Sequence, residues 1–127
     1  GCCHVRKVLP QQRALIGKKS WLSGQRQAHS AERANLQAET WDPARQLFKI
    51  LPLLEWSDSQ VWEFIRDFSV PYNALYDRGY SSIGCASCSR AITSGEPTRA
   101  GRWWWEDEQY GKECGLHVDY FNNGDGI

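Results

Sequence analysis

The sequence predicts an α/β protein that is mainly helix and loop, with two or three short strands. Three stretches carry this prediction. Residues 47–54 form an apolar run containing Pro52, which is typical of a buried strand closed by proline. Residues 20–23 are strand-like and stop at Gly24. Residues 58–68 carry the clearest helix signal in the chain.

The first element along the chain is a short predicted helix over residues 10–16. Pro10 fits a first helical turn, where its missing N–H has no partner to lose, and Gly17 fits a helix end. After the first strand comes a polar stretch, 25–33, that contains two arginines and is interpreted as a binding loop rather than a core element. Residues 34–45 predict a loop or a weak hairpin.

The helix over residues 58–68 is indicated both by its start and by its apolar face. Ser57 and Gln60 have the spacing of a capping box, in which each side chain bonds to the other residue's backbone N–H. Pro71 then ends the helix, because the residue before a proline avoids helical backbone angles. Residues 71–80 predict an aromatic-rich turn or short helix. The apolar residues on one face of the helix are Val61, Phe64, Ile65 and Phe68.

The composition is that of an ordinary globular protein, with 41% hydrophobic and 24% charged residues in 127. Lys+Arg and Asp+Glu both total 15, and this zero net charge disfavours a nucleic-acid binder. Ten of the cations are arginines, whose planar forks grip phosphate or sulfate. No apolar run approaches the roughly 20 residues that span a membrane, and no signal-peptide pattern opens the chain. Because the chain has no Met, we expect it to be a piece of a longer protein.

Four of the five cysteines form two close pairs, Cys2-Cys3 and Cys85-x-x-Cys88, which favours a four-ligand metal centre. Adjacent thiolates are awkward at a single tetrahedral zinc ion, whereas an iron–sulfur cluster offers separate iron corners, so a cluster is favoured over zinc. Buried free cysteines are the alternative without a metal. An odd number of cysteines fits a cytoplasmic protein better than a secreted disulfide framework.

The fifth cysteine, Cys114, lies in a polar, glycine-rich segment that we expect from residue 106 onward to be a mobile tail. Lys112 and His117 are close in sequence and would favour the thiolate, which is the nucleophilic form. Flanking glycines would let the segment swing a nucleophile into a site and out again. An incidental exposed cysteine is the alternative.

Four motifs occur in order: Cys-Cys-x-x-Arg-Lys-Val, Ser-Ile-Gly-Cys-x-x-Cys, Arg-Ala-Gly-Arg-Trp-Trp-Trp-Glu and Lys-Glu-Cys-Gly-Leu-His, at residues 2–8, 82–88, 99–106 and 112–117. Together they closely resemble the C-terminal half of assimilatory adenylyl-sulfate (APS) reductases, the iron–sulfur branch of the phosphoadenylyl-sulfate (PAPS) reductase family. Cluster-free PAPS reductases share the last motif but lack both cysteine pairs. The loop after Gly24 departs from the family's usual Arg-Arg-Asp-Gln-Ser and reads Arg26-Gln27-Ala28-His29-Ser30.

The resemblance implies a role for each of these residues. The ligands of a [4Fe-4S] cluster would be Cys2, Cys3, Cys85 and Cys88, with Lys7 close to the cluster and to the substrate. Substrate contacts would come from Arg26, Arg33, Arg99 and Arg102. Cys114 would attack the sulfur of APS, or of PAPS, with His117 beside it and AMP as the leaving group for APS. Thioredoxin or a similar dithiol would then release sulfite from the cysteine S-sulfonate, as a step of sulfate assimilation and cysteine biosynthesis.

The resemblance also implies an open parallel sheet of the adenine nucleotide α-hydrolase type, whose last strands would lie around Trp21 and Phe48. Residues 1–106 would be the C-terminal portion of the reductase domain with the cluster cysteines, and residues 107–127 the tail carrying the nucleophile. The competing hypothesis is a four-cysteine zinc or iron–sulfur interaction module without catalysis. His4 and His29 are expected at the surface, and at most one of the three tryptophans that follow Arg102 is expected near the active site.

Overall fold

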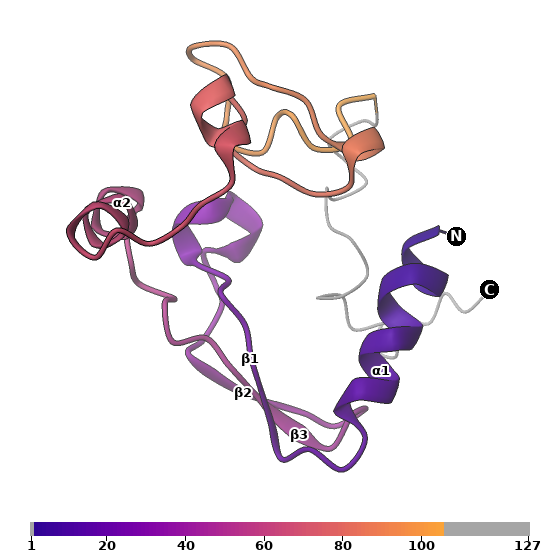
Figure 1. The fold of residues 1–127 in the computed structure, drawn as a ribbon. Coiled ribbons are helices and arrows are strands. Elements are labelled where there is room, and N and C mark those ends of the chain that lie inside the picture. Colours follow the sequence, from indigo (N-terminus) through magenta and orange to yellow (C-terminus); the bar gives the residue numbers. More distant parts are fainter. Residues whose placement is uncertain (1, 106–127) are drawn as a thin grey trace. The chain divides into compact units, whose positions relative to one another are not determined.

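The computed structural model of the chain describes residues 2–105 (Figure 1). The predictions for Cys114, His117 and the tail over residues 107–127 lie outside the described residues. No helix within the described range is long and apolar enough to cross a bilayer. The described residues form two compact units: unit 1 comprises 2–23 and 37–52, and unit 2 comprises 24–36 and 53–105.

Unit 1 opens with a continuous helical segment made of η1, His4–Val8, and α1, Leu9–Leu15. The predicted start at residue 10 was therefore wrong. Pro10 has no N–H to offer the carbonyl four residues before it. A π-helical turn directly precedes it, in which the Leu9 N–H donates to the His4 carbonyl, five residues back. The helix thus continues through the proline instead of beginning at it.

A small mixed sheet completes unit 1, and Figure 1 shows its three strands side by side. Its strands are β1, Ser20–Leu22, β2, Glu39–Asp42, and β3, Leu47–Ile50, in the order β1-β3-β2. β1 runs parallel to β3, and β2 runs antiparallel to it. The α/β fold class and the strands around Trp21 and Phe48 are therefore confirmed. Residues 34–45, predicted as a loop or a weak hairpin, hold one strand, β2, and its hairpin partner is β3 rather than another part of that stretch.

β3 is shorter than the strand predicted over residues 47–54. It ends at Ile50, and the chain then turns through Pro52. Leu47 and Leu51 are buried, but the Phe48 side chain is 42% exposed and lies against the Trp41 ring across the hairpin, with 4.9 Å between ring centroids. The apolar run predicted a fully buried strand, whereas β3 is short and exposes the aromatic side chain of Phe48.

Unit 2 contains the helix α2, Asp58–Asp67, and its capping box is confirmed. The Gln60 N–H donates to Ser57 Oγ at 3.2 Å, and the Ser57 N–H donates to Gln60 Oε1 at 2.9 Å. The apolar face of the helix is not uniformly buried, since Phe64 and Phe68 are 44% and 68% exposed.

The rest of unit 2 is built from short 3-10 turns joined by loops. The stretch predicted as an open binding loop forms two of these turns and is tied down by its backbone, since the Gln27 N–H donates to the Leu54 carbonyl at 2.9 Å. The aromatic-rich stretch also forms a short helix, as predicted, and it closes at Gly79 with a φ of +85°. The four turns are η2, Gln27–His29; η3, Ala31–Arg33; η4, Ala74–Arg78; and η5, Ala86–Cys88.

Candidate functional site

A cavity of about 200 Å³ in unit 2 gathers three of the four arginines that the sequence nominates for substrate contact. These are Arg33, Arg99 and Arg102, which come from η3 and from the segment before Trp103. Ser81, Ser82, Thr98 and His29 also line this cavity. Among the described residues no carboxylate lines it. We call it the basic cavity.

Arg102 is the most enclosed of these cations, with only 7% of the residue exposed. Its guanidinium lies against the backbone of Gly84, where any Cβ would clash with it, and 4.6 Å from the centroid of the Trp103 ring. Nη1 donates to Ser82 Oγ at 3.4 Å. Nε is buried and has no hydrogen-bond partner within residues 2–105. The guanidinium is therefore positioned by packing on two sides, and its Nε–H can still donate a hydrogen bond to a ligand.

The backbone around Arg102 is joined to the Cys85-x-x-Cys88 motif. The Trp103 N–H donates to the Cys88 carbonyl at 3.2 Å, and the Arg90 N–H donates to the Gly101 carbonyl at 2.9 Å. Trp103 itself has a φ of +41°, a left-handed conformation that is costly for a bulky residue. The segment that carries the paired cysteines and the segment that carries Arg102 therefore form one local framework.

Arg33 and His29 form a second element of the basic cavity. Arg33 is 8% exposed, and its Nη1 donates to His29 Nδ1 at 2.9 Å. His29 was expected at the surface, and its ring is half-buried beside several cations. Burial first, and then the positive charges of Arg26 and Arg33, lower the pKa of His29 to about 4.

Arg26, the fourth nominated arginine, is buried but already bonded within the protein. Its Nη1 donates to the Trp56 carbonyl at 2.8 Å, and its Nη2 forms an ion pair with Asp58 Oδ1 at 2.5 Å. These bonds fix the loop before η2 to the start of α2. The direct substrate contact proposed for Arg26 stays a prediction.

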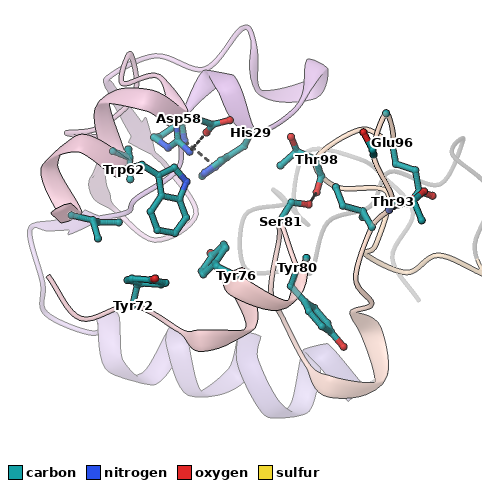
Figure 2. A pocket seen from close by; sticks show the side chains of 17 residues that line it. His29, Asp58, Trp62, Tyr72, Tyr76, Tyr80, Ser81, Thr93, Glu96 and Thr98 are labelled. Atoms are coloured by element: carbon teal, nitrogen blue, oxygen red, sulfur yellow. Dashed lines mark hydrogen bonds and ion pairs between the residues drawn. The ribbon is translucent and has the colours of Figure 1, made fainter. Parts of the chain in front are cut away.

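A larger cavity of about 650 Å³ adjoins this group, and part of its wall is formed by Trp62, Tyr72, Tyr76 and Tyr80 (Figure 2). We call it the aromatic cavity. Figure 2 shows Trp62, Tyr72 and Tyr76 gathered on one side and Thr93, Glu96 and Thr98 on the other. The Trp62 ring meets the rings of Tyr72 and Tyr76 edge to face, with centroids 5.1 and 5.4 Å away. The sequence indicated the aromatic-rich stretch over residues 71–80. It did not indicate this cavity, because the cavity wall also needs Trp62 of α2 beside that stretch.

The two cysteine pairs lie on different units. Cys85 is exposed and Cys88 half-buried, on either end of η5, where the Cys88 N–H donates to the Cys85 carbonyl at 2.9 Å. Cys2 is exposed and Cys3 half-buried, directly before η1, the helix that carries Lys7. Within either unit, no three Cys, His, Asp or Glu side chains of the described residues group closely enough to hold a metal ion. Each unit therefore contains one pair of cysteines.

Residues 1–91 match the phosphoadenosine phosphosulfate reductase domain. The chain belongs to this family. It is 57% identical over 116 residues to the adenosine 5'-phosphosulfate reductase of Allochromatium vinosum, a match covering 91% of this chain and 45% of that protein. The corresponding enzyme of Burkholderia cepacia is 51% identical over 117 residues, covering 92% of this chain and 46% of that protein. The chain thus spans about half the length of these relatives.

A solved structure of the family supports the fold. The PAPS reductase of Candida auris, in a phosphate complex, aligns with a TM-score of 0.56 and 36% sequence identity, over 66% of this chain and 40% of that one. The family resemblance stated from the four motifs is therefore confirmed, as is the interpretation of the small sheet and helices as part of an α/β reductase fold.

Proposed function

We propose that the chain is the anion-binding and cluster-binding portion of an adenylyl-sulfate reductase, which reduces APS to sulfite and AMP. One observation carries the proposal: Arg33, Arg99 and Arg102 line a single cavity without a carboxylate among its described residues. Guanidinium groups bind sulfate and phosphate oxygens through paired hydrogen bonds. The basic cavity would hold the phosphosulfate end of the nucleotide. The similar Candida auris enzyme was solved in a phosphate complex, which supports this choice of ligand.

The proposed chemistry needs fixed cations at this place. A thiolate that approaches the sulfur of a sulfate group meets an anion, and charge builds up on the oxygens as the S–O bond to the phosphate breaks. Buried arginines held in advance stabilise that charge without reorganising. Arg102 is already held between Gly84 and the Trp103 ring, so its orientation costs little at the moment of binding.

The nucleophile in this proposal is Cys114, with His117 beside it. Its thiolate forms a bond to the sulfur of APS while AMP leaves with the electron pair of the S–O bond. A dithiol reductant such as thioredoxin then attacks the Cys114 sulfur, and sulfite leaves with the electron pair of the S–S bond. The second thiol of the reductant closes its own disulfide and frees Cys114. We place this reaction in cytoplasmic sulfate assimilation, upstream of cysteine synthesis.

The donor set fits a [4Fe-4S] cluster. Cys85 and Cys88 are spaced for neighbouring irons and lie on a short turn, and Cys2 and Cys3 offer a second pair of soft ligands. When bound, the cluster would supply structural restraint and an electrostatic influence on the substrate. Lys7, on the helix directly after the second pair, would lie near it.

The test uses the complete reductase that contains this chain. Incubation with APS labelled in its sulfur, without reductant, should leave the label on Cys114, and added thioredoxin should release it as sulfite. Cys114→Ser should abolish both steps and leave the iron content unchanged. Label on another residue, or sulfite release by Cys114→Ser, would overturn the mechanism. Cluster without any labelling would favour a non-catalytic interaction module.

A further inference from the structure

His29 lies at the junction of the two cavities of unit 2. Its side chain lines both the basic cavity and the aromatic cavity, from the end of the short turn η2. Two hydrogen bonds join His29 to the backbone of Arg26. The His29 N–H donates to the Arg26 carbonyl at 3.2 Å, and the ring Nδ1 accepts from the Arg26 N–H at 3.3 Å. The ring therefore has a fixed position relative to the backbone.

The partners of Nδ1 determine the protonation state of the ring. Both the Arg26 N–H and the Arg33 guanidinium can only donate, so Nδ1 is the acceptor in both contacts and shares its one lone pair between them, with the shorter contact to Arg33. An imidazolium has no acceptor left and could make neither bond. The ring is therefore neutral, with its proton on Nε2.

The surrounding charges maintain this state. The groups that act on His29 are the cations Arg26, Arg33 and Arg99 and the carboxylate of Asp58. Asp58 is itself paired with Arg26, so the cations prevail. Together with burial, they keep the pKa of His29 at about 4, well below neutral pH.

We propose that His29 is a positioning residue of the anion site: its neutral imidazole holds the Arg33 guanidinium in the basic cavity through Nδ1. This deepens the proposed function and rests on it, because Arg33 is taken to bind the phosphosulfate. A guanidinium that is already oriented loses less conformational freedom on binding an oxyanion. A neutral acceptor does this without cancelling the positive charge that the anion needs, whereas a carboxylate in the same position would neutralise Arg33.

The test is a set of His29 variants in the complete reductase. Asparagine places an amide oxygen near the position of Nδ1, whereas glutamine places its amide near the position of Nε2. If Arg33 is held by the acceptor at Nδ1, then His29→Ala and His29→Gln should raise the KM for APS about tenfold. This is the effect expected from losing one hydrogen bond to a charged group. His29→Asn should keep KM within about threefold of the parent, and kcat should hardly change in any of them.

A double-mutant cycle separates action through Arg33 from direct contact with the substrate. Once Arg33→Ala has removed the guanidinium, adding His29→Ala should raise KM by no more than about twofold further. Additive losses would overturn the proposal, as would a glutamine variant that matches the parent while asparagine fails. If all three His29 variants lower kcat and the thermal midpoint to the same extent, the role of His29 is merely structural. That result would also overturn the proposal.

Two controls keep this test independent of the proposed function. Arg78→Ala removes an exposed arginine of η4 that lines neither cavity, and it should leave KM unchanged. Arg102→Ala should raise the KM for APS whether or not His29 positions Arg33. If the parent reductase does not turn over APS, the proposed function fails. If the parent and Arg102→Ala behave as expected but the His29 series does not, the inference about His29 fails alone.

Discussion

The two cavities of unit 2 share four lining residues but differ in how their charges are balanced. His29, Tyr76, Ser81 and Thr98 line both. The aromatic cavity contains two carboxylates, and each is paired with an arginine: Asp58 with Arg26 at 2.5 Å, and Glu96 with Arg90 at 2.7 Å. The basic cavity has three arginines and no carboxylate among its described residues. Both cavities contain cations, so in the proposed function the lining of the basic cavity, which has no carboxylate among its described residues, would favour an anion there.

Removing Arg102, the most enclosed arginine of the basic cavity, should have the largest effect on the KM for APS. Arg102→Ala removes a buried guanidinium from the basic cavity, so the KM of the complete reductase for APS should rise about 100-fold. Arg26→Ala instead removes a buried side chain that bonds to the Trp56 carbonyl and to Asp58, and it should mainly lower the free energy of unfolding, by about 1–3 kcal/mol. Steady-state kinetics and urea unfolding measure the two effects.

The contrast between these two variants is the informative part. If Arg26→Ala raises KM as much as Arg102→Ala at unchanged stability, Arg26 binds substrate directly and the division between the cavities is wrong. Arg78→Ala, which removes an exposed cation, sets the baseline for nonspecific loss of positive charge.

A smaller effect should follow from adding a single methyl group beside the basic cavity. Gly84→Ala would place a Cβ against the guanidinium of Arg102, which Trp103 blocks on another side. The guanidinium is the end of a flexible side chain, so it should shift rather than unfold the protein. We expect KM for APS to rise about tenfold, with a loss of stability of about 1 kcal/mol.

Gly24→Ala is the matched control for this methyl group, because no atom of residues 2–105 lies within 4 Å of a Cβ at that position. It should leave KM and stability unchanged. A Gly84→Ala variant with unchanged KM would show that the position of Arg102 does not limit anion binding.

Local signals predicted some of this structure well. The capping box at Ser57 and Gln60 identified the start of α2 correctly, because the bonds join residues three apart. The family resemblance nominated Arg102 from a motif and Arg33 from the loop after Gly24, but nothing in their spacing shows that side chains so far apart in sequence line one cavity. The burial of His29 was missed for the same reason: it depends on long-range contacts, such as the ion pair of Arg26 with Asp58.

Helix α1 and the aromatic cavity show two further limits of sequence reasoning. Pro10 was taken as a helix start because proline favours that position, and the π-helical turn that accommodates it has no simple sequence signature. The aromatic cavity needs Trp62 of α2 to meet Tyr72 and Tyr76, which depends on how the chain turns after the helix.

The burial of His29, together with the cations around it, should also make stability depend on pH. Its pKa is about 4 in the folded protein and 6.5 in an unfolded chain, so the unfolded state binds a proton more readily between these values. Stability should therefore fall as pH drops from about 6.5 to about 4, and His29 should contribute nothing to this dependence above that window. For a half-buried ring we expect a loss of about 1 kcal/mol.

The measurement is urea unfolding of the parent chain and of His29→Asn at pH 7.5 and pH 5. Asparagine does not titrate, so the parent should lose more stability on acidification than the variant. Other titrating groups are common to both proteins and cancel in the difference. Equal losses would mean that His29 keeps an ordinary pKa and that the cations of the basic cavity do not act on it.

The smallest effect is expected from Glu96, which lines the aromatic cavity and not the basic cavity. The two hydrogen bonds from Arg90, and then the Thr93 N–H, lower the pKa of Glu96 to about 2 from 4.5. Its contribution to stability is thus present above pH 4.5 and lost as pH falls toward 2. Glu96→Gln should lower the thermal midpoint slightly at pH 7 and less at pH 3, because exposed pairs contribute little. KM for APS should not change, since Glu96 does not line the basic cavity and its charge is already offset by Arg90. A fall in KM would show that this carboxylate opposes the anion across the boundary between the cavities, and that the two share one electrostatic environment.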